Sequence, residues 1–312
     1  MAKEAYYCTV KELNELGRDA IPAQLRSNTH LIYSSPATLA FNSPGAEGFG
    51  VKRAGLAVPD SIMLIVAPGC CGRNTSLISS MREYDNRFFY LMMDETDIVT
   101  GRHLKKIPKA VEEICNCCEK RPSVVMICIT CVDALLGTDM ERVCRKAEER
   151  VGLSVRPCYM YALTRYGRKP TMVHVRQSLY SLLEPKKKKG NVVNLLGFFS
   201  PLVDECELYD LLGSAGVRTV HEISRCKDYE EYQTMSEANF NLVLHPEARF
   251  AAEDFHNRLQ IPFIELRRLY QTDKIASQYQ AFGKVLGVTF SDEVYREKAE
   301  EAVAKFKEKR PD

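Results

Sequence analysis

The sequence lacks the features that would place the protein in a membrane or on nucleic acid. No stretch approaches the roughly 18 consecutive apolar residues of a membrane-spanning helix. The charged N-terminus has no apolar core of the kind that secretory signals contain. The 43 lysines and arginines nearly balance the 41 aspartates and glutamates, which leaves a net charge of only +2. We therefore expect a cytoplasmic protein with no membrane and no nucleic acid as partner.

Several catalytic motifs are also missing. The sequence contains no HExxH pair of a zinc hydrolase, no GxSxG elbow and no GxxxxGK[ST] phosphate-binding loop. The 6 histidines are isolated along the chain, and a lone histidine is more often a core or surface residue than a ligand. Cysteine, in contrast, occurs 12 times. Because cytosolic thiols stay reduced, this number favours metal or redox chemistry over a disulfide framework.

Apolar runs alternate with amphipathic segments along the whole chain, which predicts an α/β fold with two doubly wound parallel-sheet αβα domains. A charged linker, EPKKKKG (184–190), separates two such series. We predict an N-terminal helical arm (1–30), a first domain (31–185) and a second domain with a C-terminal helix (186–312). Residues 94–101 are expected to form a loop. The expected strands are 61–68, 87–93, 123–130, 153–160, 191–199, 217–223, 239–245 and 261–267.

Two cysteine motifs lie where a predicted strand turns into a helix. APGCCGRNTS (67–76) contains Cys70 and Cys71, and CITCVDALLGTD (128–139) contains Cys128 and Cys131. Such turns lie at the carboxyl edge of a parallel sheet, where α/β proteins bind ligands. A helix N-terminus also lowers the pKa of a thiol, which favours metal ligation. Cys128 falls inside the predicted strand and is expected to face the core.

A third motif, ICNCC (114–118), is interpreted as structural. Its cysteines, Cys115, Cys117 and Cys118, lie near the end of a predicted helix and would point around much of its circumference. One cluster could not easily collect all three thiols. A second metal site remains the alternative.

The same segments resemble the nitrogenase component 1-like family. APGCCGRNTS resembles the family's Gly-Pro-x-Gly-Cys-Gly turn, so that Cys71 takes the place of a cluster ligand, followed by Gly72. DIVTG (97–101) resembles the family's Asp-Ile-Val-x-Gly segment. In SVVMICITCVDALLGTD (123–139), Cys131 takes the place of a further cluster cysteine. The family includes nitrogenase alpha and beta subunits, assembly scaffolds, dark-operative protochlorophyllide reductase subunits and a nickel-tetrapyrrole reductive cyclase.

This sequence departs from the family pattern in three places. The most N-terminal cluster cysteine has no counterpart, and Ser34 or Ser35 stands near its expected position. The cysteine that anchors the nitrogenase cofactor is replaced in NLVLHPEAR by His245. The chain also ends after the second domain, where full-length members continue into a third. These departures argue against dinitrogen reduction by this protein alone.

The resemblance implies an iron–sulfur cluster bound by Cys71 and Cys131 at a subunit interface, most simply a 4Fe–4S cluster. A larger P-cluster-like cluster would draw in Cys70 or Cys128. The implied partners are a second copy or a sister subunit, together with a homodimeric Fe–S ATPase reductase that alone uses ATP. The resemblance implies an oxidoreductase subunit that passes electrons to a tetrapyrrole or another small molecule. The alternative is a non-catalytic scaffold or carrier in metallocluster assembly, or the lesser subunit of a heteromeric complex.

Overall fold

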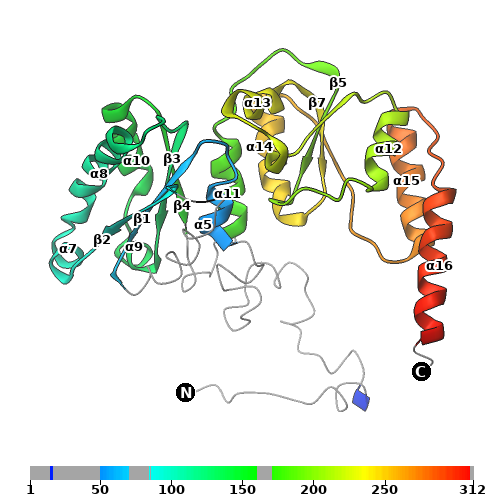
Figure 1. Cartoon of the computed structure of the whole chain (residues 1–312), viewed down its shortest axis with the longest axis horizontal. Helices are drawn as coiled ribbons and strands as arrows, with labels where there is room; N and C mark the ends of the chain where they lie inside the picture. The colour runs from blue at the N-terminus through cyan, green and yellow to red at the C-terminus, as the bar shows by residue number, and fades with distance from the viewer. Residues whose placement is uncertain (1–14, 17–49, 70–83, 85, 160–170, 310–312) are drawn as a thin grey trace.

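The fold consists of two parallel sheets with helices on both faces of each, which confirms the predicted class (Figure 1). The computed structural model describes residues 15–16, 50–69, 84, 86–159 and 171–309. Each sheet has four strands, in the orders β2-β1-β3-β4 and β6-β5-β7-β8. In both orders the first strand of the series occupies an inner position, and the next strands are added on either side of it. This is the doubly wound arrangement.

The first sheet contains β1 (Ile62–Ala67), β2 (Phe88–Met92), β3 (Val124–Ile129) and β4 (Ser154–Tyr159). All six residues of β1 and all six of β3 are buried, as continuous apolar strands covered on both faces should be. Alternate side chains of β1 point to opposite faces. Ile62, Leu64 and Val66 pack under α8 (His103–Cys117) and α10 (Met140–Val151). Met63 and Ile65 face α5 (Gly50–Gly55) and α11 (Thr171–Tyr180).

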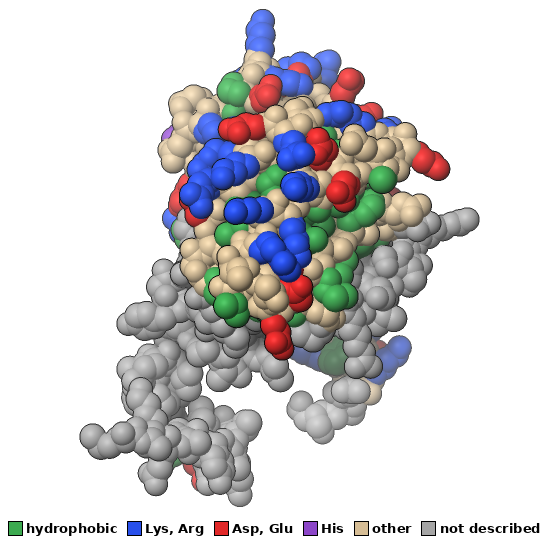
Figure 2. Space-filling view, turned by 90° about the vertical axis from the view of Figure 1, so that its left-hand side faces the viewer, with side chains coloured by type: hydrophobic (Ala, Val, Ile, Leu, Met, Phe, Trp, Pro, Cys, Tyr) green, Lys and Arg blue, Asp and Glu red, His purple; other side chains and the backbone are tan. Residues whose placement is uncertain are grey.

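The outer face of α8 and α10 is polar and rich in cations (Figure 2). Its exposed lysines and arginines alternate with exposed glutamates, as expected of amphipathic helices that cover a sheet. The exposed cations are Lys105, Lys109, Arg142, Arg145, Lys146 and Arg150.

The second sheet contains β5 (Lys189–Leu196), β6 (Thr219–His221), β7 (Ala238–Val243) and β8 (Phe263–Glu265). Its outer face packs on α12 (Glu207–Ser214) and α15 (Thr272–Leu286). The final helix, α16 (Glu293–Lys309), extends along α15 and has no buried residue. Short segments complete this half of the chain: η4 (Ile223–Arg225), α13 (Tyr229–Thr234), η5 (Met235–Glu237) and η6 (Pro246–Ala248).

A single apolar layer joins the two sheets. The inner faces of both sheets, together with α5, α11 and α14 (Arg249–Leu259), form one continuous cluster of buried side chains. Figure 1 shows α11 and α14 lying between the sheets. The aromatic rings of Tyr180 on α11 and Phe255 on α14 lie 5.2 Å apart at their centroids. The two halves are therefore held together by core packing and not only by the linker.

Two local expectations were wrong. Residues 94–101, expected to form a loop, contain the helix α7 (Glu95–Thr100). Asp94 caps α7 in a reciprocal capping box with Asp97, and Gly101 ends it with φ 65°. The charged linker is also shorter than the expected 184–190, because β5 begins at Lys189. Lys188 donates to the carbonyl oxygen of Ser236, and its burial lowers the pKa of its amine.

None of the described helices combines the length and the apolar character that crossing a membrane requires.

Arg176 is the main polar contact inside the shared apolar layer. Its guanidinium donates to the carbonyl oxygens of Gly197 and Met172 and to Glu247 Oε2 at 2.8 Å. It also stacks over the ring of Phe199, with 4.6 Å to the ring centroid. Only 3% of the Arg176 side chain and 13% of the Glu247 side chain are exposed. This pair links α11 of the first half to η6 of the second.

We predict that Arg176→Met lowers the free energy of unfolding by about 3 kcal/mol, because Glu247 is left as an uncompensated buried charge. Urea unfolding measures this change. Arg249→Met is the matched control, since Arg249 pairs with Glu253 and Glu265 at the surface. An exposed pair of this kind contributes less than about 1 kcal/mol. Equal losses in the two variants would show that the buried pair does not hold the halves together.

Candidate functional site

The carboxyl ends of β1 and β3 lie next to each other, and both predicted cysteine turns start there. The two strands pair in parallel, with Val66 opposite Ile129. After β3, Thr130 leads directly into α9 (Cys131–Leu136). After β1, the chain continues through Pro68, whose carbonyl oxygen accepts a hydrogen bond from Tyr90 Oη. The turns that carry the predicted ligands thus leave one edge of one sheet.

The structure locates the predicted ligands unequally. Cys131 is the first residue of α9. Cys70, Cys71 and Gly72 lie outside the described residues, as do Ser34 and Ser35. Cys128 lies inside β3 and is fully buried in the apolar layer between the sheets. Its place in the core agrees with its position in the strand, and its role as a ligand remains a prediction.

The cysteines of ICNCC are dispersed at the end of α8. Cys115 and Cys118 are partly buried, whereas Cys117 is exposed. Burial raises the pKa of both Cys115 and Cys118, which favours their protonated forms. Within the part of the chain that the structure describes, no three or more His, Cys, Asp or Glu side chains form a group suited to a metal ion. The structural interpretation of this motif stands as a prediction.

A buried histidine–aspartate pair lies directly beside the Cys131 turn. His103, at the start of α8, has only 1% of its side chain exposed, and Asp133 on α9 has none. His103 Nε2 lies 2.9 Å from Asp133 Oδ1, and His103 Nδ1 lies 3.0 Å from the carbonyl oxygen of Asp97. Thr138 Oγ1 also donates to Asp133 Oδ1, at 3.0 Å. Nothing in the sequence indicated this pair, because His103 stands alone there and Asp133 lies 30 residues further along the chain.

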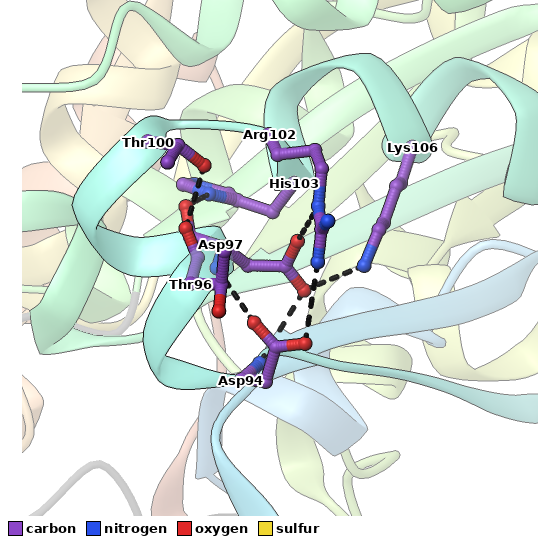
Figure 3. A network of polar contacts seen from close by, with 7 residues as sticks. All are labelled: Asp94, Thr96, Asp97, Thr100, Arg102, His103 and Lys106. Carbon is purple, nitrogen blue, oxygen red and sulfur yellow. Dashed lines mark hydrogen bonds and ion pairs between the residues drawn. The ribbon is translucent and has the colours of Figure 1, made fainter.

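Asp97 connects this pair to the surface (Figure 3). Its carboxylate accepts from Lys106 Nζ at 2.6 Å and from Arg102 Nε at 2.8 Å. These hydrogen bonds, from Lys106 and then Arg102, hold the pKa of Asp97 well below its usual range. The side chain of Asp94 closes the network through the backbone N–H of Asp97 and the guanidinium of Arg102. The α7–α8 corner is thereby fixed from its exposed rim to the imidazole of His103.

Two polar atoms near Cys131 have no hydrogen-bond partner. Thr130 Oγ1 and Asp133 Oδ2 are both buried and unsatisfied among the described residues. Buried polar atoms are nearly always hydrogen-bonded, so an orphaned pair needs an explanation. Both belong to residues within two positions of Cys131. A ligand at this turn that accepts a hydrogen bond would satisfy the Thr130 hydroxyl, whereas Asp133 Oδ2 needs a donor.

His245 occupies the corresponding edge of the second sheet, just after β7. Its Nδ1 accepts from the backbone N–H of Glu247 at 3.3 Å, and its ring lies edge-on to Phe198, with 5.8 Å between centroids. The residue after β5, Gly197, lies close to the backbone of His245, because a Cβ on Gly197 would be 2.8 Å from the His245 nitrogen. Since β5 and β7 flank the point where the strand order reverses, His245 lies at the usual ligand-binding edge.

A crevice of about 1040 Å³ lies at the opposite edge of the first sheet. It runs between the amino ends of β1 and β2 and the segments that follow β5 and β6. Its lining includes Asp60, Arg87, Cys118, Phe199 and Cys226. The guanidinium of Arg87 is bonded to the carbonyl oxygens of Leu56, Val58 and Ser61. The crevice is therefore separate from the Cys131 turn.

Comparisons with known proteins agree with this architecture. Residues 47–312 match the family described as "Nitrogenase component 1 type Oxidoreductase". The chain is 27% identical over 222 residues to the nitrogenase iron-molybdenum cofactor biosynthesis protein NifE of Nostoc sp., covering 67% of this chain and 44% of that protein. It is 26% identical over 280 residues to NifE of Mesorhizobium japonicum, covering 87% and 53% respectively.

A catalytic subunit and a solved structure are also similar. The nitrogenase molybdenum-iron protein alpha chain of Methanosarcina barkeri is 24% identical over 267 residues, which is 81% of this chain and 48% of that one. The structure of nitrogenase Cp1 at pH 6.5 superposes with a TM-score of 0.59 and 17% identity, covering 80% of this chain and 59% of that one. The chain thus spans about half the length of the curated relatives that it matches. With the family matched from residue 47 to residue 312, the chain belongs to the nitrogenase component 1 type oxidoreductases.

Proposed function

We propose that the chain is a cluster-holding subunit that serves as a scaffold or carrier in metallocluster assembly. The observation that carries this proposal is the single edge of the first sheet at which the β1 and β3 turns emerge together. The relatives named as NifE, a cofactor biosynthesis protein, support the scaffold role over a catalytic one. In this proposal Cys71 and Cys131 are the thiolate ligands, with Gly72 beside Cys71.

The described residues fit such a group. A cluster at the Cys131 turn would give hydrogen-bond partners to the orphaned Thr130 hydroxyl. Cys128 suits the ligand role less well, because it would have to leave the apolar layer between the sheets. Cys70 is then the better candidate for a further ligand of a larger cluster. When bound, an iron–sulfur cluster supplies one-electron redox chemistry, and this chain supplies its thiolates and its shielding from water.

Exposed apolar side chains at the same edge support an interface there. Met92 ends β2, Val99 lies on α7 and Leu136 ends α9, with 63%, 84% and 47% of their respective surfaces exposed. Two thiolates from each of two chains complete the four that a cubane needs. A second copy or a sister subunit would therefore both finish the cluster and cover these side chains.

The second candidate function is a subunit of an ATP-dependent reductase. The similarity to the Methanosarcina barkeri alpha chain favours it. In this case a separate homodimeric Fe–S ATPase would deliver electrons, and a tetrapyrrole or another small molecule would receive them. ATP-dependent turnover with such a reductase would identify this function, whereas transfer of a cluster to an acceptor protein without turnover would identify the scaffold.

We predict that Cys71→Ala and Cys131→Ala each remove most of the bound iron, because alanine offers no ligand. Iron analysis and the visible absorption of anaerobically purified protein measure the loss. The matched control replaces Cys115, Cys117 and Cys118 together with alanine, which should leave the iron content unchanged. Wild-type iron in both single variants would refute the assignment of ligands. Loss of a defined share of iron in the folded control would instead reveal a second site.

We also predict that cluster and assembly are thermodynamically linked, because a cluster that needs ligands from two chains stabilises their association. Anaerobic chelation of iron should weaken self-association, or association with a sister subunit, by at least about tenfold in Kd, which corresponds to roughly 1.4 kcal/mol. Analytical ultracentrifugation under anaerobic conditions measures it. A stable monomer that keeps a full cluster would contradict the shared site.

A further inference from the structure

The protonation of His103 is constrained by its two partners. The carbonyl oxygen of Asp97 can only accept, so His103 Nδ1 must carry a proton and donate it. On the other side, Nε2 lies 2.9 Å from Asp133 Oδ1, and because a carboxylate oxygen only accepts, this hydrogen bond needs a second proton, on Nε2 or on the carboxyl group. With 1% of the imidazole exposed, neither nitrogen depends on water. The ring is therefore held between α7 and α9 in a single orientation.

Asp133, the partner of His103, does not take the helix-capping role that its position in the sequence predicts. Thr130-x-x-Asp133 has the pattern of a capping box, in which both side chains would bind the backbone at the start of α9. Among the residues that the structure describes, Thr130 Oγ1 has no hydrogen-bond partner, and Asp133 Oδ1 is bound to His103 and Thr138. The Asp133 carboxylate thus binds His103 instead of the backbone at the start of α9.

Packing alone does not explain why a polar pair is buried at this position. A buried polar pair of this kind contributes little net stability compared with an apolar pair of the same volume. The six-residue helix α9 is too short to be stable by itself. The hydrogen bonds of Asp133 connect the first turn of α9 to His103 at the start of the longer α8. Through Thr138 they also connect it to the residues that follow α9.

We propose that His103 is a positioning residue for the cluster: through Asp133 it fixes the turn that presents Cys131 and leaves the Thr130 hydroxyl available to the cluster. This inference deepens the proposed function and rests on ligation by Cys131. Hydrogen bonds from residues behind the ligands orient them, and their loss typically weakens metal retention about 10- to 100-fold. A hydroxyl that donates to a cluster sulfur also changes the reduction potential.

Three variants test the proposal in the full chain, purified anaerobically with its iron. His103→Leu removes both hydrogen bonds, and we expect iron to be lost to a chelator about tenfold faster. His103→Gln keeps a donor for Asp133, so its rate should lie between those of His103→Leu and wild type. Thr130→Val removes a hydroxyl that has no partner among the described residues. It should therefore leave the unfolding midpoint of the iron-free protein unchanged, while shifting the reduction potential and the electron paramagnetic resonance signal of the cluster in the iron-loaded protein.

Tyr232→Phe is the control for a general loss of stability. It removes another fully buried hydrogen bond, from Tyr232 Oη to the carbonyl oxygen of Leu179, in the layer between the sheets. We expect it to lower the unfolding midpoint without changing the rate of iron loss or the cluster signal.

The outcomes separate this inference from the function on which it rests. Wild-type iron loss in His103→Gln, together with a wild-type potential in Thr130→Val, would overturn the positioning role and leave the cluster site intact. Iron content that is unaffected by Cys131→Ala would instead overturn the ligation by Cys131 on which this inference rests. If His103→Leu does not fold, His103→Gln and Thr130→Val still decide the question.

Discussion

Burial of both faces of both sheets is the constraint on which the rest of the structure depends. Strands such as β1 and β3 are apolar on both sides, so helices must cover each face, and the crossover connections then make the strands parallel. Parallel strands end at one edge, which is why the turns after β1 and β3 emerge together. The same rule places His245 at the carboxyl edge of the second sheet.

The apolar layer shared by the two sheets explains how a chain of this length remains one body. Its middle helices pack on each other, with α11 covering the first sheet and α14 covering the second, so the two halves bury apolar side chains against each other. Arg176 satisfies carbonyl groups in this layer that apolar side chains could not. The relatives are about twice as long, and the scaffold proposal depends on the two sheets that this chain shares with them.

The polar interior near Cys131 differs from the apolar core formed by the strands of the first sheet. Elsewhere in the first sheet the buried residues are apolar and fill space, whereas His103, Asp133 and Thr130 combine a bonded pair with orphaned oxygens. Such atoms are retained in proteins where they hold a geometry or meet a ligand. The exposed rim of this network, formed by Asp94, Arg102 and Lys106, reaches the surface beside α7.

Hydrophobic patterning by itself determined the parallel αβα class, the eight described strands to within a few residues and the strand–helix turn of Cys131, because these depend on local periodicity. It missed α7, whose start rests on the capping box of Asp94. It also placed Lys188 in a charged linker, although the amine of Lys188 donates a hydrogen bond to the carbonyl oxygen of Ser236. Only the tertiary structure decided that Asp133 binds His103 and that Thr130 Oγ1 has no partner within the described part of the chain. A hydrogen bond between α8 and α9 depends on how two helices meet over the sheet, and no periodicity within either segment encodes that distance.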